Sequence, residues 1–321
     1  MPKICLLTPA PPGSTNGNRA TAERWSRLLG EAGYTVDITS RTPARDSDGL
    51  IALHATRSAD AIAHWSTTTD KPLIVVLTGT DVYHYQHEQP EVFAHSLRVA
   101  DALVGLHGLI HRDIPEDAHG KLHIIWQSAS PLRLHQPVTV PWRVVVVGHL
   151  RDEKDPLRAA RAVRNLPLDS RIEVVQLGKA HTAEWAKQAE AEMARNPNYR
   201  WLGECDAATT ARWMASAQAM VISSVMEGGA NVVSEACAMG LPVIASKIPG
   251  NTGLLGEDYP ALFPPGNTEA LRQLLRKGET HPSWMQELRD LCWQIGQEKF
   301  RPETEQAALV RLLTDLGLPP A

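Results

Sequence analysis

The sequence predicts an α/β protein made of two Rossmann-like, doubly wound domains that face a central cleft, and two observations lead to this prediction. Short apolar runs of strand length alternate with segments of helical period along nearly the whole chain, as in parallel sheets covered on both faces. The alternation lapses once, between 128 and 141, where three prolines occur. We therefore expect an N-terminal domain over 1–137 and a C-terminal domain over 138–300.

The first half shows the alternation element by element. Strand-length apolar runs occur at 3–8, 34–39, 50–54, 73–78, 102–106 and 123–127. Helical spacing occurs around Trp25, Leu28 and Ala32, ending at Gly33, and again at 59–65, 91–100 and 107–114. Ligands bind at the carboxyl ends of the strands in such folds, so the loops after these runs are the places to search for a site.

The second half repeats the pattern. Strands are expected at 142–147, 171–178, 199–203, 219–224 and 241–246. Helices are expected at 157–166, 183–194, 207–217, 231–239, 268–277 and 282–299, and 248–255 is expected to be a small loop. The last segment, 301–321, has leucine and alanine spacing suited to a helix that packs back on the first domain.

Composition excludes several classes of protein. A hydrophobic content of 43% and a charged content of 21% are those of a globular chain, and a net charge of −4 gives no basic footprint for nucleic acid. No apolar run reaches membrane-spanning length, so we expect a cytoplasmic protein without a membrane partner. The four cysteines lie far apart, which favours buried thiols over a metal site or disulfides.

The most informative stretch is the strand–loop–helix–strand unit at 219–246. Its loop contains Glu227, Gly228 and Gly229, and Asn231 stands where a helix N-cap would be. The start of such a helix, at Asn231 and Val232, presents backbone N–H groups suited to a phosphate. About two helical turns later, Glu235 is suited to accept hydrogen bonds from the two hydroxyls of a ribose. The alternative is a solvated glutamate and an ordinary glycine turn.

Charged groups follow a strand of the second half. Arg151 and Lys154 come directly after the run 142–147, where a fork-shaped donor and a point charge would neutralise a diphosphate. Read alone, this cluster is more typical of a solvated surface than of a binding site. Gly178 and Glu204 follow the next two strands, and their tips are placed to frame a nucleotide base.

In the first half, polar residues gather after three strands. The loop after the first strand carries Thr15, Asn16, Asn18 and Arg19, and the arginine suits an oxyanion, although a flexible turn with a surface arginine would have the same composition. His54 ends the third run, where a lone histidine is more often structural than catalytic. Thr80 and Asp81 follow the fourth run.

The string S-S-V-M-E-G-G-A-N-V-V-S-E-A-C-A-M-G-L-P-V-I-A-S resembles the E-x7-E signature of family-4 glycosyltransferases with the GT-B fold. The segments after the strands at 50–54, 73–78 and 142–147 are similar to cleft-lining and phosphate-binding segments of that family. The resemblance implies that Lys154 and Arg151 stabilise the leaving diphosphate and that Glu227 contacts the sugar. It also implies a nucleotide-sugar site over Gly228, Gly229, Asn231, Val232, Glu235 and Gly178.

A narrower resemblance covers N-G-N-R-x-T-A-x-R-W, L-T-G-T-D-V-Y and E-G-G-A-N-V-V-S-E-A, which together are similar to the selenosugar synthases of selenoneine biosynthesis. It implies that the sugar of a UDP-sugar, UDP-GlcNAc or UDP-glucose, is joined to selenophosphate with release of UDP. The product would pass to a later enzyme of selenoneine biosynthesis. Acceptor contacts are then expected from Thr15, Asn16, Asn18, Arg19, His54, Thr80 and Asp81.

Two alternatives stay open beside this reading. One is a conventional family-4 glycosyltransferase with an alcohol acceptor, for which a general base near the acceptor is expected. The other is a non-catalytic protein that binds nucleotide sugars, since a fold does not establish an activity. No metal or cofactor is expected in any of the three, because no cluster of metal ligands is visible and Lys/Arg with helix termini can hold a diphosphate.

Overall fold

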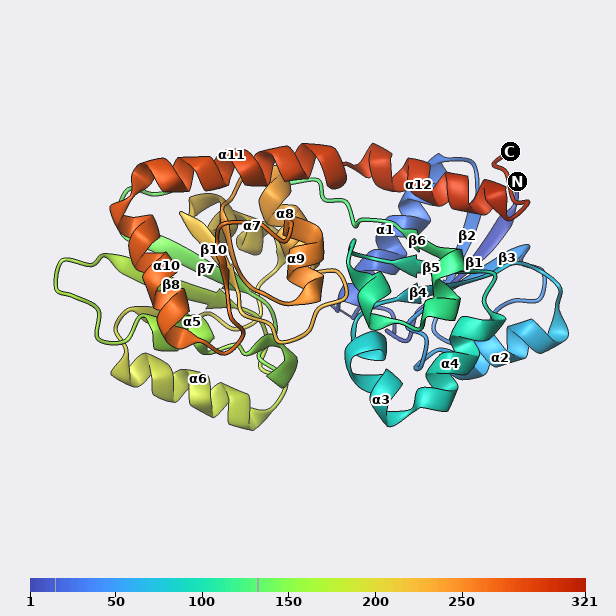
Figure 1. Ribbon diagram of the computed structural model, residues 1–321, viewed down its shortest axis with the longest axis horizontal. Helices are drawn as coiled ribbons and strands as arrows, with labels where there is room; N and C mark the ends of the chain where they lie inside the picture. Colours follow the sequence, from blue (N-terminus) through green and yellow to red (C-terminus); the bar gives the residue numbers. More distant parts are fainter. Residues whose placement is uncertain (15, 132) are drawn as a thin grey trace. The chain divides into compact units, whose positions relative to one another are not determined.

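Figure 1 shows the computed structural model of the chain, which describes residues 1–14, 16–131 and 133–321. The chain forms two compact units. The first contains Met1–Ser128, Glu227–Asn231 and Pro302–Ala321, and the second contains Ala129–Met226 and Val232–Arg301. The break after Ser128 lies at the start of the proline-containing stretch, earlier than the expected boundary at 137. The first unit is therefore assembled from three separate parts of the sequence.

The sheet of the first unit has six parallel strands in the order β2-β1-β3-β4-β5-β6. These strands are β1 Lys3–Leu7, β2 Thr35–Thr39, β3 Gly49–Leu53, β4 Leu73–Leu77, β5 Ala102–Gly105 and β6 Leu122–Ile124. Three of the inner strands, β3, β4 and β5, are buried at every residue, as expected for parallel strands covered on both faces. The strand order reverses at β1, which pairs with β2 on one side and β3 on the other.

Helices cover both faces of this sheet. On one face, α1 (Gly17–Glu31) and α12 (Pro302–Asp315) pack against alternate strand residues such as Ile4 and Leu6. On the other face, α2 (Ala59–Thr68) and α4 (Pro90–Val99) pack against Cys5 and Leu7. This alternation follows from the two-residue period of a strand. The last helix of the chain thus belongs to the core of the first unit.

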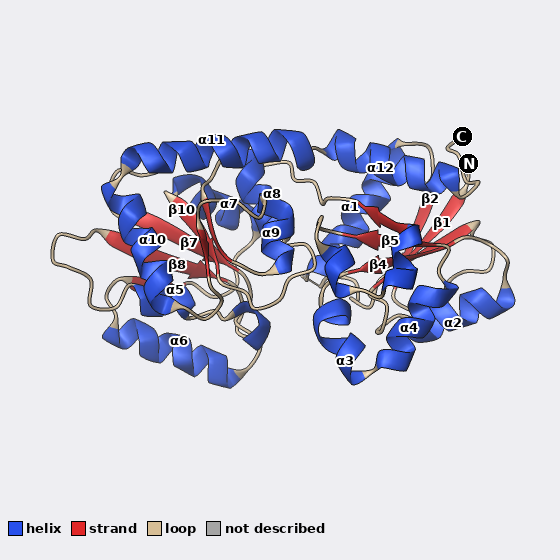
Figure 2. Cartoon of the chain, viewed as in Figure 1, coloured by secondary structure: helices blue, strands red, loops and turns tan. Residues whose placement is uncertain are grey.

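The second unit contains another six-stranded parallel sheet, in the order β12-β11-β10-β7-β8-β9. Its strands are drawn in red in Figure 2. Its strands are β7 Trp142–Val147, β8 Ile172–Leu177, β9 Tyr199–Trp201, β10 Ala219–Ile222, β11 Val243–Ser246 and β12 Leu262–Phe263. Its helices are α5 Arg158–Ala162, α6 Ala183–Arg195, α7 Ala207–Ser216, α8 Asn231–Met239, α9 Pro249–Leu255, α10 Thr268–Thr280 and α11 Pro282–Lys299. Here the order reverses between β7 and β10, which are neighbours in the sheet.

Three expected elements are wrong, for local reasons. The helix expected at 107–114 is only a 3₁₀ turn, Ile110–Asp113, because Ile114 precedes a proline and is extended. The helix expected at 157–166 is the short α5, and Asn165 follows it in the left-handed region with a φ of 54°. The loop expected at 248–255 is helix α9, which has proline at its first position and ends at Gly256.

Several short elements were not expected at all. A π-helical turn, Asp81–Tyr85, and the single helical turn α3 (Gln86–Glu88) follow β4. Strand β12 has only two residues, which is too short for an apolar run to reveal it.

Candidate functional site

The second unit has its strand-order reversal where β7 and β10 end side by side. Open α/β sheets bind ligands at this position, outside the carboxyl ends of the two strands. A small cavity of about 10 Å³ lies there, lined by the loop after β7, with Gly148 and Lys154, and by the end of β10, with Ser223 and Ser224. Lys154 thus lies at the topological switch point of its sheet. Its contact with a diphosphate stays a prediction.

The loop that carries Lys154 is held by the neighbouring strand. Asp152–Lys154 forms a 3₁₀ turn, and the Ser223 hydroxyl donates to the carbonyl oxygens of Lys154 (3.2 Å) and Asp155 (3.0 Å). Arg151 precedes the turn, and its Nε lies 3.7 Å from a carboxylate oxygen of Glu153. This acidic neighbour partly neutralises the charge of Arg151. Both predicted cations therefore belong to one loop, and the lysine lines the cavity.

Two histidines that sequence reasoning had not assigned lie beside this loop. The rings of His149 and His181 have centroids 5.3 Å apart, and His149 Nδ1 accepts a hydrogen bond from the backbone N–H of Lys179. Burial lowers the pKa of both imidazoles below the ordinary value, which favours the neutral form. Gly178, at the tip of β8, has a φ of 143°, and a β-carbon there would overlap the carbonyl group of Gly148.

Helix α8 presents one acidic side chain. Residues Val233, Ser234 and 236–239 are buried, whereas Glu235 is exposed and Val232 is half-buried. Since every other residue in the second half of the helix is covered, Glu235 is the part of it that a ligand can reach. The carboxylate therefore has the accessibility that binding to ribose hydroxyls requires.

The loop Glu227–Asn231 belongs to the first unit by its contacts, although helix α8 continues from it into the second. The backbone of Gly228 passes against that of Thr78 and Gly79, and a β-carbon on either glycine would overlap the other segment. Glu227 is only 8% exposed. The glycine at 228 is thus required by a close backbone approach, a role separate from any contact with a substrate.

Two side chains of the first unit hold this loop, and neither was assigned a role from the sequence. Arg24 donates from Nη1 to the side-chain oxygen of Asn231 at 3.1 Å. In the amide orientation that satisfies its neighbours, Gln127 donates to the Gly229 carbonyl (2.9 Å) and to the same Asn231 oxygen (3.2 Å). Arg24 stands within the N-G-N-R-x-T-A-x-R-W string, so the string itself was the available signal.

Arg24 is itself anchored by a buried carboxylate. Its Nε donates to both oxygens of Glu305, whose side chain is fully buried on α12. Trp25 Nε1 donates to the same carboxylate at 2.6 Å, and the N–H and hydroxyl of Ser128 donate to its other oxygen. The chain Glu305–Arg24–Asn231 therefore links the last helix to the glycine loop within the first unit.

The residues predicted to contact an acceptor lie at the carboxyl ends of the first unit's strands. Asn16 caps helix α1, accepting from the Arg19 N–H at 3.0 Å, and Arg19 Nε pairs with Glu23 at 2.7 Å. Asn18 lies in the first turn of the same helix and is half-buried. Thr15, also predicted here, lies outside the described residues.

His54 is buried, with a positive φ of 75° that marks a constrained backbone. Its Nδ1 accepts from the Arg57 N–H (3.1 Å), so the Nε2 proton points to the Thr80 hydroxyl (3.0 Å) in the neutral tautomer. Burial lowers the pKa of His54, which keeps this tautomer neutral. His54 and Thr80, predicted separately, are therefore hydrogen-bonded partners.

Asp81 bonds to the backbone, whereas His54 and Thr80 bond to each other through their side chains. It is fully buried, and its carboxylate accepts hydrogen bonds from the backbone N–H groups of Ala55, Thr78, Gly79 and Val82. These bonds shape the loop after β4 and join it to the end of β3. The carboxylate thus acts on the loop geometry, and its predicted contact with an acceptor stays a prediction.

The part of the chain that the structure describes has no group of three or more His, Cys, Asp or Glu side chains placed to hold a metal ion. No helix in that part of the chain is long and apolar enough to span a membrane.

Two parallel six-stranded sheets of this order are those of the GT-B glycosyltransferase fold. The structure of Anabaena Alr3699/HepE in complex with UDP and glucose is similar, with a TM-score of 0.78 and 15% identity, covering 98% of this chain and 100% of that one. The sucrose-phosphate synthase (tll1590) of Thermosynechococcus elongatus is also similar, with a TM-score of 0.79 and 17% identity over 99% of each chain. Both likenesses concern the fold.

The family is established by the sequence. Residues 135–297, more than half of the chain, match the glycosyl transferases group 1, and the chain belongs to that family. A relative is the putative teichuronic acid biosynthesis glycosyltransferase TuaC of Bacillus subtilis (strain 168), 23% identical over 271 residues. The alignment spans 78% of this chain and 66% of that relative, just under two thirds of its length.

Proposed function

We propose that this glycosyltransferase transfers the sugar of a UDP-sugar to selenophosphate, forms a carbon–selenium bond and releases UDP. The observation that carries the donor half is the placement of Lys154 at the switch point of the second unit's sheet. The Anabaena protein of the same fold was solved with UDP and with UDP-glucose, which supports a UDP-sugar as donor. The acceptor half rests on the resemblance of three sequence strings to those of selenosugar synthases.

In this proposal, positively charged groups bind the diphosphate of the donor and carboxylates bind its hydroxyl groups. Lys154 and Arg151 neutralise the charge that grows on the departing diphosphate, together with the helix start at Asn231 and Val232. Glu235, exposed on α8, accepts hydrogen bonds from the ribose hydroxyls. Glu227 binds the hydroxyls of the transferred sugar.

The proposed reaction requires little acid–base catalysis by the protein. The selenium atom of selenophosphate attacks the anomeric carbon, the bond from that carbon to the diphosphate oxygen breaks, and UDP departs with the electron pair. A selenium nucleophile is largely deprotonated at neutral pH, so no general base needs to stand beside it. Asn18 and Arg19 hold the acceptor anion in this scheme, and catalysis comes from positioning and charge stabilisation.

The test is UDP release from UDP-GlcNAc or UDP-glucose by the purified chain, with and without selenophosphate, and mass analysis of the products. UDP that appears only with selenophosphate, together with a selenium-bearing sugar, is the expected result. Release of UDP with alcohol acceptors but not with selenophosphate would replace the proposal by a conventional transferase. Donor binding without release under any condition would leave a nucleotide-sugar-binding protein.

We also propose that the reaction needs no metal ion. Lysine, arginine and helix termini neutralise the diphosphate here, so EDTA should leave the rate of UDP release within about twofold, since no metal–diphosphate contact is lost. Rate measurements after EDTA treatment, with and without added Mg²⁺, check this. A loss of activity that Mg²⁺ restores would contradict it.

A further inference from the structure

The loop after β7 places His149 beside Lys154. Both side chains line the small cavity at the switch point of the second unit's sheet. A β-carbon added to Gly148, the residue before His149, would lie 4.0 Å from Cδ of Lys154, so the lysine side chain folds back over this part of the loop. An imidazole ring thus stands next to the cation that is proposed to bind the diphosphate.

The backbone on both sides of His149 is fixed by the neighbouring strand. The N–H of Gly148 donates to the Leu177 carbonyl at 2.9 Å, and the N–H of Leu150 donates to the Lys179 carbonyl at 2.9 Å. These bonds continue the parallel pairing of β7 with β8 beyond the ends of the two strands. The histidine is therefore held by a rigid part of the fold, as a binding residue must be to keep one position.

A backbone contact fixes the tautomer of the ring. The N–H of Lys179 donates to His149 Nδ1 at 3.2 Å, so in the neutral ring Nδ1 is the acceptor and Nε2 carries the proton. Among the residues that the structure describes, none accepts a hydrogen bond from Nε2. This N–H is therefore available to a ligand at the ends of the strands.

The surroundings of the ring keep it neutral. Burial is the main cause that lowers the pKa of His149, and nearby cations add to it. A second proton would have to bind Nδ1, where it would face the N–H of Lys179. His181 lies beside the ring, and burial lowers its pKa too. The charged groups that face the two rings are Arg151, Glu153, Lys154, Lys179 and Glu204.

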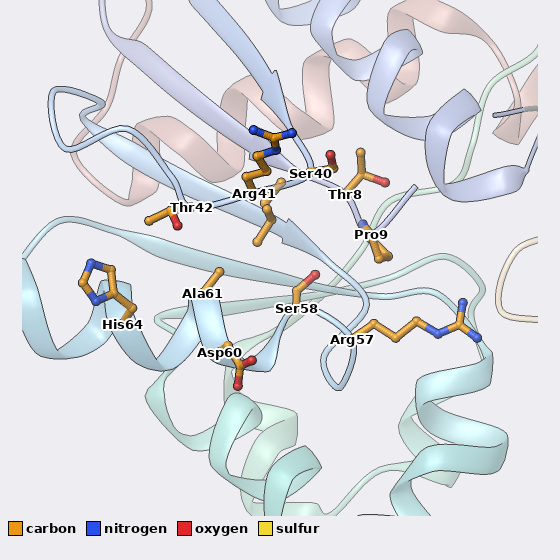
Figure 3. Close-up of a pocket in the computed structure, with 11 residues that line it drawn as sticks. Thr8, Pro9, Ser40, Arg41, Thr42, Arg57, Ser58, Asp60, Ala61 and His64 are labelled. Atoms are coloured by element: carbon orange, nitrogen blue, oxygen red, sulfur yellow. The ribbon is translucent and has the colours of Figure 1, made fainter. Parts of the chain in front are cut away.

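A pocket of about 350 Å³ in the first unit offers a contrast (Figure 3). Arg41 lines it from the loop after β2, and Arg57 lines it from the segment after β3. Their guanidinium groups point in different directions, so the two side chains do not converge on one position. Lys154 and His149, by comparison, belong to one loop and line the same cavity.

We infer that His149 is a further residue of the donor site, and that its neutral imidazole donates a hydrogen bond from Nε2 to the diphosphate beside Lys154. The inference rests on the proposed UDP-sugar donor. Negative charge grows on the diphosphate as its bond to the anomeric carbon breaks. A fixed N–H donor therefore binds the transition state more strongly than the ground state.

The experiment compares two substitutions of the same ring. His149→Ala removes the donor, whereas the amide of His149→Gln can place an N–H near the position of Nε2. With UDP-glucose and selenophosphate, kcat for UDP release should fall by about tenfold to a hundredfold in the alanine variant and by less than about threefold in the glutamine variant. Circular dichroism and thermal unfolding establish that the variants are folded.

His181→Ala is the matched control. Its ring adjoins that of His149, with centroids 5.3 Å apart, but it does not line the cavity, so kcat should stay within about twofold of the wild type. The inference is overturned if His149→Ala and His149→Gln lose activity equally. It is also overturned if His181→Ala loses as much as His149→Ala, since packing of the ring pair would then be the cause.

A binding measurement tests the charge of the ring. UDP-glucose suits it, because its diphosphate has no proton to exchange near neutral pH. Calorimetry should show an affinity about fivefold weaker in His149→Ala than in the wild type. For a neutral donor this ratio stays constant between about pH 8 and pH 6. A ratio that grows as pH falls would mean that the ring binds as an imidazolium, which contradicts the inference.

Failure of this inference and failure of the proposed function give different results. If the wild type and His149→Ala form the selenium-bearing sugar at equal rates, the function stands and the inference falls. If UDP-glucose affinity falls in His149→Ala and recovers in His149→Gln, but selenophosphate yields no product, the inference stands and the proposed acceptor falls. A wild-type chain that binds no UDP-sugar would overturn both.

Discussion

Burial in the first unit determines the charge of two histidine side chains, His54 and His107. His107 is fully buried, its Nδ1 accepts from the Leu109 N–H, and its Nε2 lies 2.9 Å from the Tyr83 hydroxyl. That hydroxyl donates in turn to Asp113. Burial, reinforced by nearby His111, lowers the pKa of His107 to about 4. The folded chain therefore binds a proton at His107 more weakly than the unfolded chain does.

This difference predicts a pH-dependent stability. Between pH 6.5 and about 4 the unfolded chain binds the proton and the folded chain does not, so stability should fall as pH falls through this window, by up to about 3 kcal/mol. Urea denaturation across the window should show a smaller fall in His107→Gln. The exposed His87→Gln serves as control, and an equal fall in His107→Gln and the wild type would contradict the assignment.

A second prediction at the residue scale concerns Glu235. The carboxylate is exposed on an otherwise buried stretch of α8, and Glu235→Ala should weaken UDP binding about tenfold by removing hydrogen bonds to the ribose. Calorimetric titration with UDP measures this. Glu190→Ala, an exposed glutamate on α6, should leave the affinity unchanged, and equal affinities for all three proteins would refute the role of Glu235.

At the scale of elements, the loop between β10 and α8 depends on backbone contact. Gly228→Ala should destabilise the chain by about 1–3 kcal/mol, because the added methyl group overlaps the backbone of Thr78 and Gly79. Thermal and urea unfolding measure the loss. Gly30→Ala is the control: its β-carbon meets no atom within 4 Å, and alanine favours the helix, so stability should stay equal or rise.

The elements also show where sequence patterns are reliable. The strands at 73–77 and 142–147 and the helices at 183–195 and 282–299 are close to their expected positions, because a buried apolar run or a long apolar face is a strong periodic signal. The expected helix at 107–114 and the loop at 248–255 are wrong because single prolines and a buried histidine side chain decide such short segments. Short segments carry too few residues for a period to be measured.

At the scale of the whole chain, three distant segments meet around one carboxylate. The Glu305 carboxylate is the acceptor in all five of these hydrogen bonds. Arg24 donates to both oxygens, Trp25 donates to one, and the Ser128 N–H and hydroxyl donate to the other. An amide at this position would turn its NH₂ group toward donors in either orientation. The carboxylate is therefore matched to its site by charge and by hydrogen-bonding capacity.

Glu305→Gln should consequently cost about 3–5 kcal/mol of stability, as expected when one partner of a buried ion pair is removed. Urea unfolding is the measurement. Glu31→Gln removes the exposed partner of Arg27 on α1 and should cost less than about 1 kcal/mol. Similar small losses for both variants would show that the buried carboxylate is not an anchor.

The sequence by itself determined the class of fold, the two sheets, the family and the strand ends where the candidate site residues lie, because periodic burial and strand-end motifs are local properties. Only the tertiary structure decided that Asp81 serves backbone N–H groups, that Gly228 packs against Gly79, and that Arg24, Gln127 and Glu305 hold the glycine loop. It also revealed that the Lys179 N–H fixes the tautomer of His149. Such pairings join residues far apart in the chain, and spacing along one sequence does not determine which distant side chains meet.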